Sequence, residues 1–92
     1  MANFYFTYGT SPQFPFQGGW TRVEADSLQE AIDAFRAVHA DRTPHTVNCA
    51  FWYTEEKFKK TIMFNNPEDT FWFKEHEVLN AKEILCEKER GL

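Results

Sequence analysis

The chain has 92 residues and a formal net charge of −4, so it fits one domain with a single core and lacks the basic excess that binding a nucleic-acid backbone requires. Hydrophobic residues make up 42% and charged residues 26%, which is ordinary for a globular protein and excludes a disordered chain. The aromatic share of 17%, with ten phenylalanines, indicates either a Phe-rich core or rings left on the surface for binding.

The sequence predicts a reduced protein with no membrane segment. Cys49 and Cys86 do not form a CxxC pair, and two isolated cysteines are typical of free thiols, although the sequence leaves a disulfide between them open. No basic and apolar leader precedes the first predicted strand, and no apolar run reaches the roughly 18 residues of a membrane span. We therefore expect a cytoplasmic protein.

The first quarter of the chain predicts a hairpin with a long loop. Residues 3–8 alternate as a strand, and residues 20–25 form a second one after a Gly-Gly turn. Between them, the loop 9–19 contains Phe14 and Phe16 among prolines and glycines. These two rings either tuck under the sheet or stand out as a recognition element. The side chains of the second strand expected to face the core are Thr21, Val23 and Ala25.

Residues 26–40 predict the helix on which the rest of the chain packs. Ser27 and Glu30 are spaced as a capping box, with Asp26 as an alternative N-cap. Apolar residues recur at helical spacing, so they lie on one face that needs a sheet to cover it. The members of this apolar face are Leu28, Ala31, Ile32, Phe35 and Val38.

The second half is expected to add two strands and a helix. After a polar loop at 41–46, residues 47–53 are predicted to form a fully buried or central strand. Thr54 caps a short helix over 54–63, with Phe58 and Ile62 pointing inward and Glu55–Lys59 and Glu56–Lys60 pairs outside. A turn at 65–70 precedes a last strand at 76–84, although this region also has good helix propensity.

The elements predict a single compact α+β domain spanning residues 1–92. Their order is β-β-α-β-α-β. The expected architecture is a single-layer, mainly antiparallel four-stranded sheet with the two helices on one face.

No catalytic or metal-binding signature is present. His39, His45 and Cys49 lie close in the sequence, but without the paired spacing of zinc ligands, and His39 is expected near the helix C-terminus. A cysteine in the middle of a strand is normally inert, and no phosphate loop, GxSxG or HExxH motif occurs. We expect no metal, no cofactor and no enzymatic activity.

Protein binding through exposed aromatic rings is the favoured function. The predicted contact residues are Phe14, Phe16, Trp20 and Trp52, because large rigid side chains dominate interface energetics. Trp72 is a further aromatic side chain available for such a surface. The alternative is that these rings are core, or that they associate in a homodimer. The negative net charge suits a basic partner, such as a nucleic-acid-binding protein.

Two other functions remain open from the sequence. Arg42, His45 and Asn48 could lie near Trp52 or Tyr5 and offer a nucleotide both charge and an aromatic plane. A self-associating structural or accessory protein is the third possibility.

Several stretches resemble one family of small proteins. NFYFTYGTSPQFPFQGGW, VEADSLQEAIDAFRAVHADRTP, VNCAFWYTEEKFKKT and HEVL are together similar to small uncharacterised proteins encoded by phages and prophages of Gram-positive bacteria. The resemblance implies a protein that acts in the bacterial host cytoplasm and inhibits a host defence protein, as anti-CRISPR proteins do, by blocking its surface or sequestering a signal nucleotide. It implies no catalytic residues.

Overall fold

The fold is seen in a computed structural model that describes residues 1–65 and 74–90. Except for Asn65, the predicted turn at 65–70 lies outside the described residues, as does Trp72. Along the chain, the elements are β1 (Ala2–Thr7), β2 (Trp20–Ala25), α1 (Leu28–Val38), β3 (Phe51–Thr54), α2 (Glu55–Phe58), α3 (Ile62–Asn65), β4 (Glu75–Asn80) and α4 (Ala81–Arg90).

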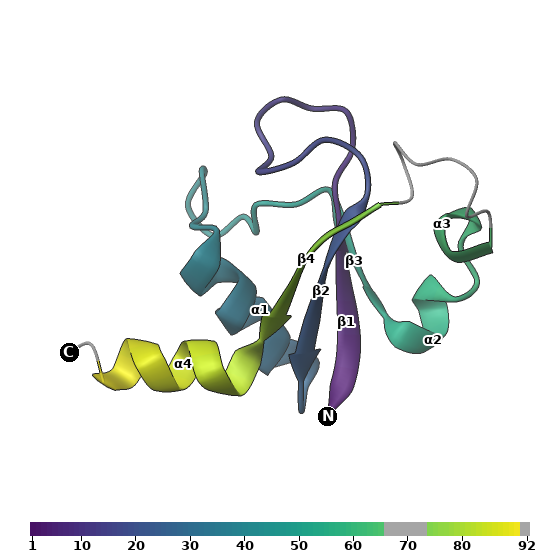
Figure 1. Ribbon diagram of the computed structural model, residues 1–92. Helices are drawn as coiled ribbons and strands as arrows, with labels where there is room; N and C mark the ends of the chain where they lie inside the picture. Colours follow the sequence, from purple (N-terminus) through teal and green to yellow (C-terminus); the bar gives the residue numbers. More distant parts are fainter. Residues whose placement is uncertain (66–73, 91–92) are drawn as a thin grey trace.

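The four described strands form one sheet in the order β3-β1-β2-β4 (Figure 1). β1 pairs antiparallel with β2 and with β3, whereas β4 pairs parallel with β2. The α+β class is therefore confirmed, and the sheet is mainly antiparallel as predicted, with one parallel pairing between β2 and β4. The predicted hairpin of residues 3–8 and 20–25 is also confirmed, because Ala2–Thr7 and Trp20–Ala25 are its strands.

Two glycines close the hairpin loop. Gly18 and Gly19 have φ values of 68° and 66°, in the left-handed region that side chains disfavour. A Cβ added to Gly19 would lie 2.0 Å from the carbonyl oxygen of Lys74, so the approach of β4 to β2 requires a glycine there.

The capping box of α1 forms as predicted. The backbone N–H of Glu30 donates to Ser27 Oγ at 3.1 Å, and the Glu30 carboxylate accepts from the backbone N–H of Asp26 at 3.1 Å. These bonds satisfy backbone donors that have no partner within the helix. The apolar face ends earlier than predicted, because Val38 is 42% exposed and Ala34 is buried instead.

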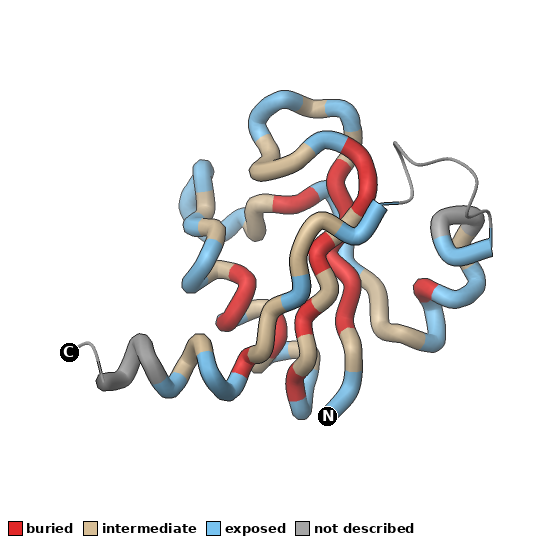
Figure 2. The backbone as a smooth tube through the Cα atoms, in the orientation of Figure 1, coloured by how far each residue is buried: buried red, intermediate tan, exposed pale blue. Residues whose placement is uncertain are grey.

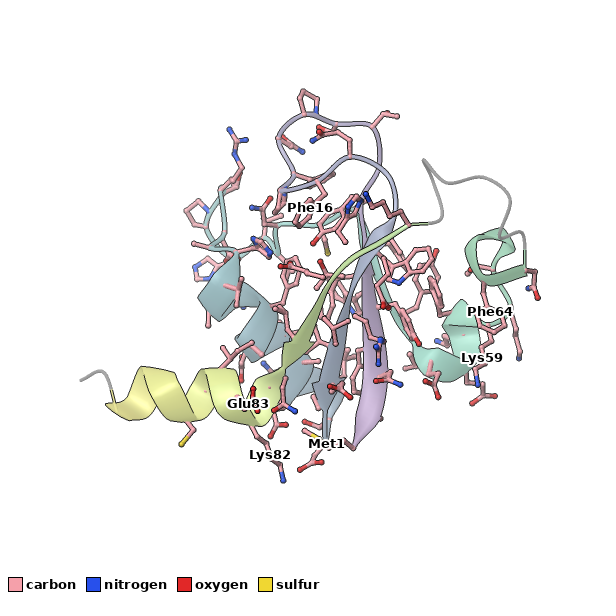
Figure 3. The ribbon with its side chains drawn as sticks, in the orientation of Figure 1. Met1, Phe16, Lys59, Phe64, Lys82 and Glu83 are labelled. Atoms are coloured by element: carbon pink, nitrogen blue, oxygen red, sulfur yellow. The ribbon has the colours of Figure 1, made fainter. Side chains whose placement is uncertain are left out.

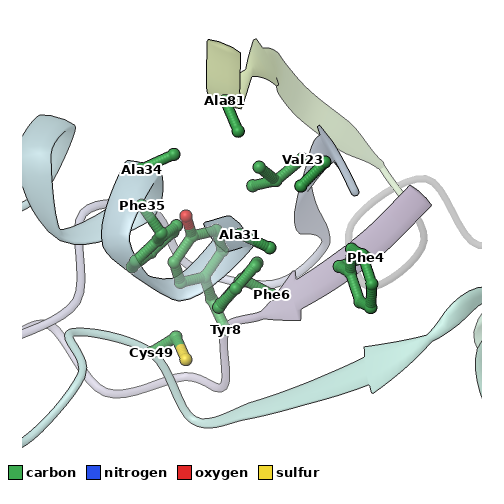
Figure 4. Close-up of a cluster of buried hydrophobic side chains, with 10 residues drawn as sticks. Phe4, Phe6, Tyr8, Val23, Ala31, Ala34, Phe35, Cys49 and Ala81 are labelled. Atoms are coloured by element: carbon green, nitrogen blue, oxygen red, sulfur yellow. The ribbon is translucent and has the colours of Figure 1, made fainter. Parts of the chain in front are cut away.

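The larger core lies between the sheet and α1. Phe6 of β1 stacks on Phe35 of α1 with ring centroids 4.5 Å apart, and Val23 of β2 and Ala81 of α4 close the same cluster (Figure 4). The buried residues concentrate on β1, β2 and the side of α1 that faces them (Figure 2).

A second aromatic stack covers the opposite face of the sheet. Tyr5 stacks on Phe58 of α2 at 4.0 Å with an interplanar angle of 3°. Consecutive side chains of a strand point to opposite faces, so α1 and α2 lie on opposite sides of β1. The prediction that both helices share one face is therefore wrong. β1 is central and covered on both faces, which is why Tyr5 and Thr7 are buried as well as Phe6.

β3 is a short outer strand, so the prediction of a buried or central strand over 47–53 is wrong. It spans only Phe51–Thr54 and pairs with β1 alone among the described strands. Cys49 is buried but precedes the strand. A short apolar run does not reveal whether its strand is central or outer, and the aromatic residues here occupy an edge.

The C-terminal region divides into a strand and a helix. β4 ends at Asn80, whose side chain accepts from the backbone N–H of Glu83 at 3.1 Å and so caps α4. The prediction of a strand through residue 84 is wrong beyond this cap, because the Ala-Lys-Glu-Ile-Leu segment that follows consists mostly of good helix formers.

The helix predicted over 54–63 is interrupted. Thr54 caps α2 as expected, Glu55 pairs with Lys59 at 3.9 Å, and Phe58 is fully buried. The hydroxyl of Thr61 then donates to the carbonyl of Phe58 at 2.7 Å, a local bond that competes with helix continuation. The side chain of Ile62, the second predicted anchor, lies outside the described part of the chain.

Candidate protein-binding site

The outer edge of β3 exposes two large aromatic side chains. Phe51 is 58% exposed and Trp52 is 39% exposed. Trp52 lies opposite Phe6, on the α1 face of the sheet, whereas Phe51 lies opposite Thr7, on the α2 face. The edge is therefore flanked by an exposed ring on each side.

The two outer strands of the sheet differ in charge. β4 carries Glu75 and Glu77 within the strand, whereas the four residues of β3 carry no charge. Charged side chains on an outer strand hinder pairing with another chain, and an uncharged aromatic edge does not. Of the two outer strands in the described residues, β3 is the one without such charges.

An aromatic row continues from β3 across α2 to α3. It consists of Phe51, Tyr53, Phe58 and Phe64, whose successive ring centroids are 4.9, 6.1 and 6.3 Å apart. Phe58 is buried against Tyr5, while Phe64 at the far end is 49% exposed; Figure 3 shows Phe64 on the outside of this end of the molecule. The exposed rings at the two ends of the row, Phe51 and Phe64, are thus connected through the buried ring of Phe58. Rings held in place before binding lose little conformational freedom when a partner binds.

Hydrogen bonds from β1 fix the position of β3. Thr7 Oγ1 donates to the carbonyl of Phe51 at 3.1 Å, and Asn3 Nδ2 donates to Glu55 Oε2 at 2.7 Å. The bond from Asn3, together with the nearby Lys59 ammonium, lowers the pKa of the Glu55 carboxyl. Both ends of β3 are thereby attached to the central strand.

The two predicted loop aromatics pack against the core. Phe16 is half-buried and stacks on His76 with ring centroids 4.5 Å apart and an angle of 4°. Phe14 is also half-buried and packs against the same cluster. Of the two arrangements open from the sequence, the rings adopt the one in which they pack against the core and do not stand out from the loop.

The predicted tryptophans lie on opposite faces of the sheet. Trp20 is half-buried on the α2 face, where it contacts Phe58 and donates from Nε1 to Glu75 Oε1 at 3.2 Å. Trp52 lies on the α1 face at the outer edge. The four predicted contact residues therefore do not form one surface. Phe51 was missed, because residues 47–53 were expected to form a buried or central strand and only the pairing of β3 shows Phe51 at an edge.

Two of the three predicted ligand-binding residues lie together around a small, open hollow of about 40 Å³. Arg42 donates from Nη1 to the carbonyl of Gln13 at 2.9 Å, and Asn48 donates from Nδ2 to the carbonyl of Ala40 at 3.3 Å. His45 does not line the hollow. The residues that do are Gln13, Phe14, Arg42, Thr43, Thr46, Val47 and Asn48. Neither Tyr5 nor Trp52 is among them, and the aromatic ring in the lining is that of Phe14.

A polar network near Phe16 joins β2 and β4 to the residues that directly follow β1 and α1. The hydroxyl of Thr21 donates to Glu77 Oε1 at 2.9 Å, so its oxygen accepts from Tyr8, 2.6 Å away. The His39 ring also contacts Glu77, so the ring bonds β4 and not the last carbonyls of α1. The backbone N–H of His39 does cap α1. Every member bonds another side chain, as a structural network requires.

The Cys49 thiol is unsuited to catalysis. Burial raises its pKa to about 12, and a thiol must ionise to act as a nucleophile. Within residues 1–65 and 74–90, no three His, Cys, Asp or Glu side chains are grouped to hold a metal ion. In the same ranges, no helix has the length and apolar character to cross a membrane.

Comparisons with protein-family models, curated proteins and solved structures found no match. The resemblance to phage-encoded proteins therefore stays a prediction from the sequence.

Proposed function

We propose that this chain is a non-enzymatic binding protein that covers a surface of a partner protein with the edge of β3 and the aromatic row. The observation that carries the proposal is an uncharged outer strand with exposed aromatic rings, Phe51 and Trp52, on its two sides. Aromatic side chains are the residues that most often dominate binding energy at protein interfaces.

The proposed partner is a bacterial host protein, specifically a defence component such as a CRISPR-Cas effector, which the chain inhibits by occlusion in the host cytoplasm. The phage-type sequence resemblance motivates this target. The net charge of −4 favours encounter with a basic protein, because complementary charge accelerates association.

The proposal is tested by capture from host lysate with four forms of the tagged protein. We expect the unaltered chain to retain a stoichiometric partner and Phe51→Ser/Trp52→Ser to lose it. Truncating an interface anchor costs on the order of 2–4 kcal/mol, or roughly 30- to 1,000-fold in affinity. Val78→Ser is the matched control, because Val78 is 45% exposed on β4 at the other edge.

The fourth form, Phe14→Ser/Phe16→Ser, tests the contact residues predicted in the loop. Because both rings pack against the core, its melting temperature is measured beside its binding. Inhibition of the captured partner's activity by the unaltered chain completes the test. Capture that survives Phe51→Ser/Trp52→Ser with the fold intact would contradict the proposal.

Nucleotide sequestration receives less support from the geometry. The hollow beside Arg42 offers about 40 Å³ of space, far below the roughly 300–1,000 Å³ of typical ligand sites. The same eluate, heat-denatured and examined by mass spectrometry, tests this function: a nucleotide released without a protein partner would favour it. Sedimentation of the purified chain tests self-association.

A further inference from the structure

We infer, on the basis of the proposed function, that the partner binds by adding an extended strand to the outer edge of β3. We also infer that the partner residues next to this added strand, beside the lysines that follow Thr54, are acidic. The inference concerns the mode of binding and the chemistry of the partner segment. It rests on the outer edge of β3, which pairs with no further strand in the part of the chain that the structure describes, and on the lysines that follow β3.

The main chain of β3 favours a strand as the occupant. β1 is paired on both sides, by β2 and β3, whereas the outer side of β3 faces no other strand in the described residues. A strand added there gains main-chain hydrogen bonds that a docked helix cannot make. Its side chains would alternate between the face of Phe51 and the face of Trp52, where cross-strand aromatic pairs stabilise a sheet.

The charges beside β3 favour an acidic flank. Three lysines, Lys57, Lys59 and Lys60, follow the strand within six residues of Thr54, and all are exposed. They outnumber the two glutamates of the same segment, of which Glu55 already bonds Asn3 and Lys59. Figure 3 shows Lys59 beside Phe64, at the end of the aromatic row.

These lysines lie within reach of a strand that continues past Thr54. Three residues span at most about 11 Å, so the backbone of Lys57 lies close to the end of β3. The local charge is thus opposite in sign to the net charge of the chain. A partner segment with apolar residues beside β3 and aspartate or glutamate beside the lysines is complementary to both the aromatic edge and the basic region.

The test uses a display library of random twelve-residue peptides selected against the full chain. We expect the selected peptides to share an alternating run of β-branched or aromatic residues followed or preceded by acidic residues. A selected peptide should protect backbone amides of β3 from hydrogen exchange, which is the signature of strand addition.

Reversing the charge of the lysines then tests whether they bind the acidic residues of the peptide. Lys57→Glu/Lys60→Glu should weaken binding of the acidic peptide by about tenfold and flatten its salt dependence. Lys74→Glu, an exposed lysine at the start of β4, is the matched control and should change neither. Phe51→Ser/Trp52→Ser should abolish peptide binding.

The inference is overturned if no peptide is selected, if the peptides show helical spacing or basic flanks, or if β3 amides stay unprotected. It is also overturned if reversing the lysines has no effect. Any of these results, combined with lysate capture that depends on Phe51 and Trp52, leaves the proposed function standing. Loss of that dependence removes the proposed function itself.

Discussion

At the scale of single residues, His45 adopts a backbone conformation that its side chain disfavours. Its φ is 65°, and it follows Pro44 in a turn closed by the Thr46 N–H donating to the carbonyl of Thr43 at 3.1 Å. Proline at the first central position and a positive φ at the second define a type II turn, in which glycine is preferred. His45 therefore stores strain at the tip of an exposed turn.

Replacing this residue tests the strain directly. His45→Gly should stabilise the protein by about 0.5 kcal/mol, because the relief of left-handed strain exceeds the entropy cost of glycine. For a domain of this size we expect a rise of roughly 2–4 °C in melting temperature, measured by circular dichroism. His45→Ala, which keeps the Cβ, should give no such rise. A lower melting temperature for His45→Gly would mean that the side chain stabilises the turn.

At the scale of elements, one ion pair attaches the end of α1 to the following loop. Arg36 donates to both carboxylate oxygens of Asp41, from Nε at 3.0 Å and from Nη2 at 2.6 Å. This bidentate bond lowers the pKa of the Asp41 carboxyl below its ordinary value of 3.8. The pair links the last turn of the helix to the segment that leads to β3.

The lowered pKa predicts how this link depends on pH. A carboxyl whose pKa is lower in the folded state contributes stability above its unfolded pKa and loses it as the pH falls through the folded value. Asp41→Asn should therefore lower the melting temperature at pH 7, and the difference from the unaltered chain should shrink as the pH falls below the ordinary value of 3.8 and vanish below the lowered pKa of Asp41. Asp33→Asn, on the exposed side of the same helix, is the control. A difference that persists in acid would assign the effect to packing.

Elements specified by local signals were predictable from the sequence, and elements specified by pairing were not. The capping box at Ser27, the Gly18-Gly19 turn and the alternation of residues 3–8 act over a few residues, so α1 and the hairpin followed directly. The position of β3 depends on which strand it pairs with, which its run of apolar residues does not encode.

The candidate site shows the same division. Trp52 was predicted as a contact residue and is exposed, whereas Phe51 could be recognised as exposed only once β3 was placed at the edge. The loop rings Phe14 and Phe16 carry no sequence signal that separates a packed ring from a projecting one. Phe16 stacks on His76, which is distant in the sequence.

At the scale of the whole molecule, the sheet carries an aromatic stack on each face. Phe6 and Phe35 form the stack on the α1 face, and Tyr5 and Phe58 form the one on the α2 face. Neighbouring residues of β1 supply both stacks, so the two faces share one central strand. We expect them to unfold together.

Truncating Phe58, on the α2 face, tests whether the two faces unfold together. Phe58→Ala should cost about 3–5 kcal/mol, because it removes a buried ring and leaves a cavity, and this is a large part of the stability of a domain this size. Urea unfolding followed by circular dichroism and by tryptophan fluorescence should give one shared midpoint. Phe58→Leu should cost less. Two separate transitions would show that the α2 face unfolds independently.

The parallel pairing of β4 with β2 has a consequence for how the chain folds. It joins residues 55 positions apart, such as Trp20 and Glu75, whereas β1, β2 and α1 can assemble from consecutive residues. During synthesis the first half can organise early, yet Val23 and Phe16 stay without their β4 neighbours until residue 80 has left the ribosome. Because long-range closure is slow, this late strand sets the pace of folding and leaves the edge of β2 open to wrong partners until then.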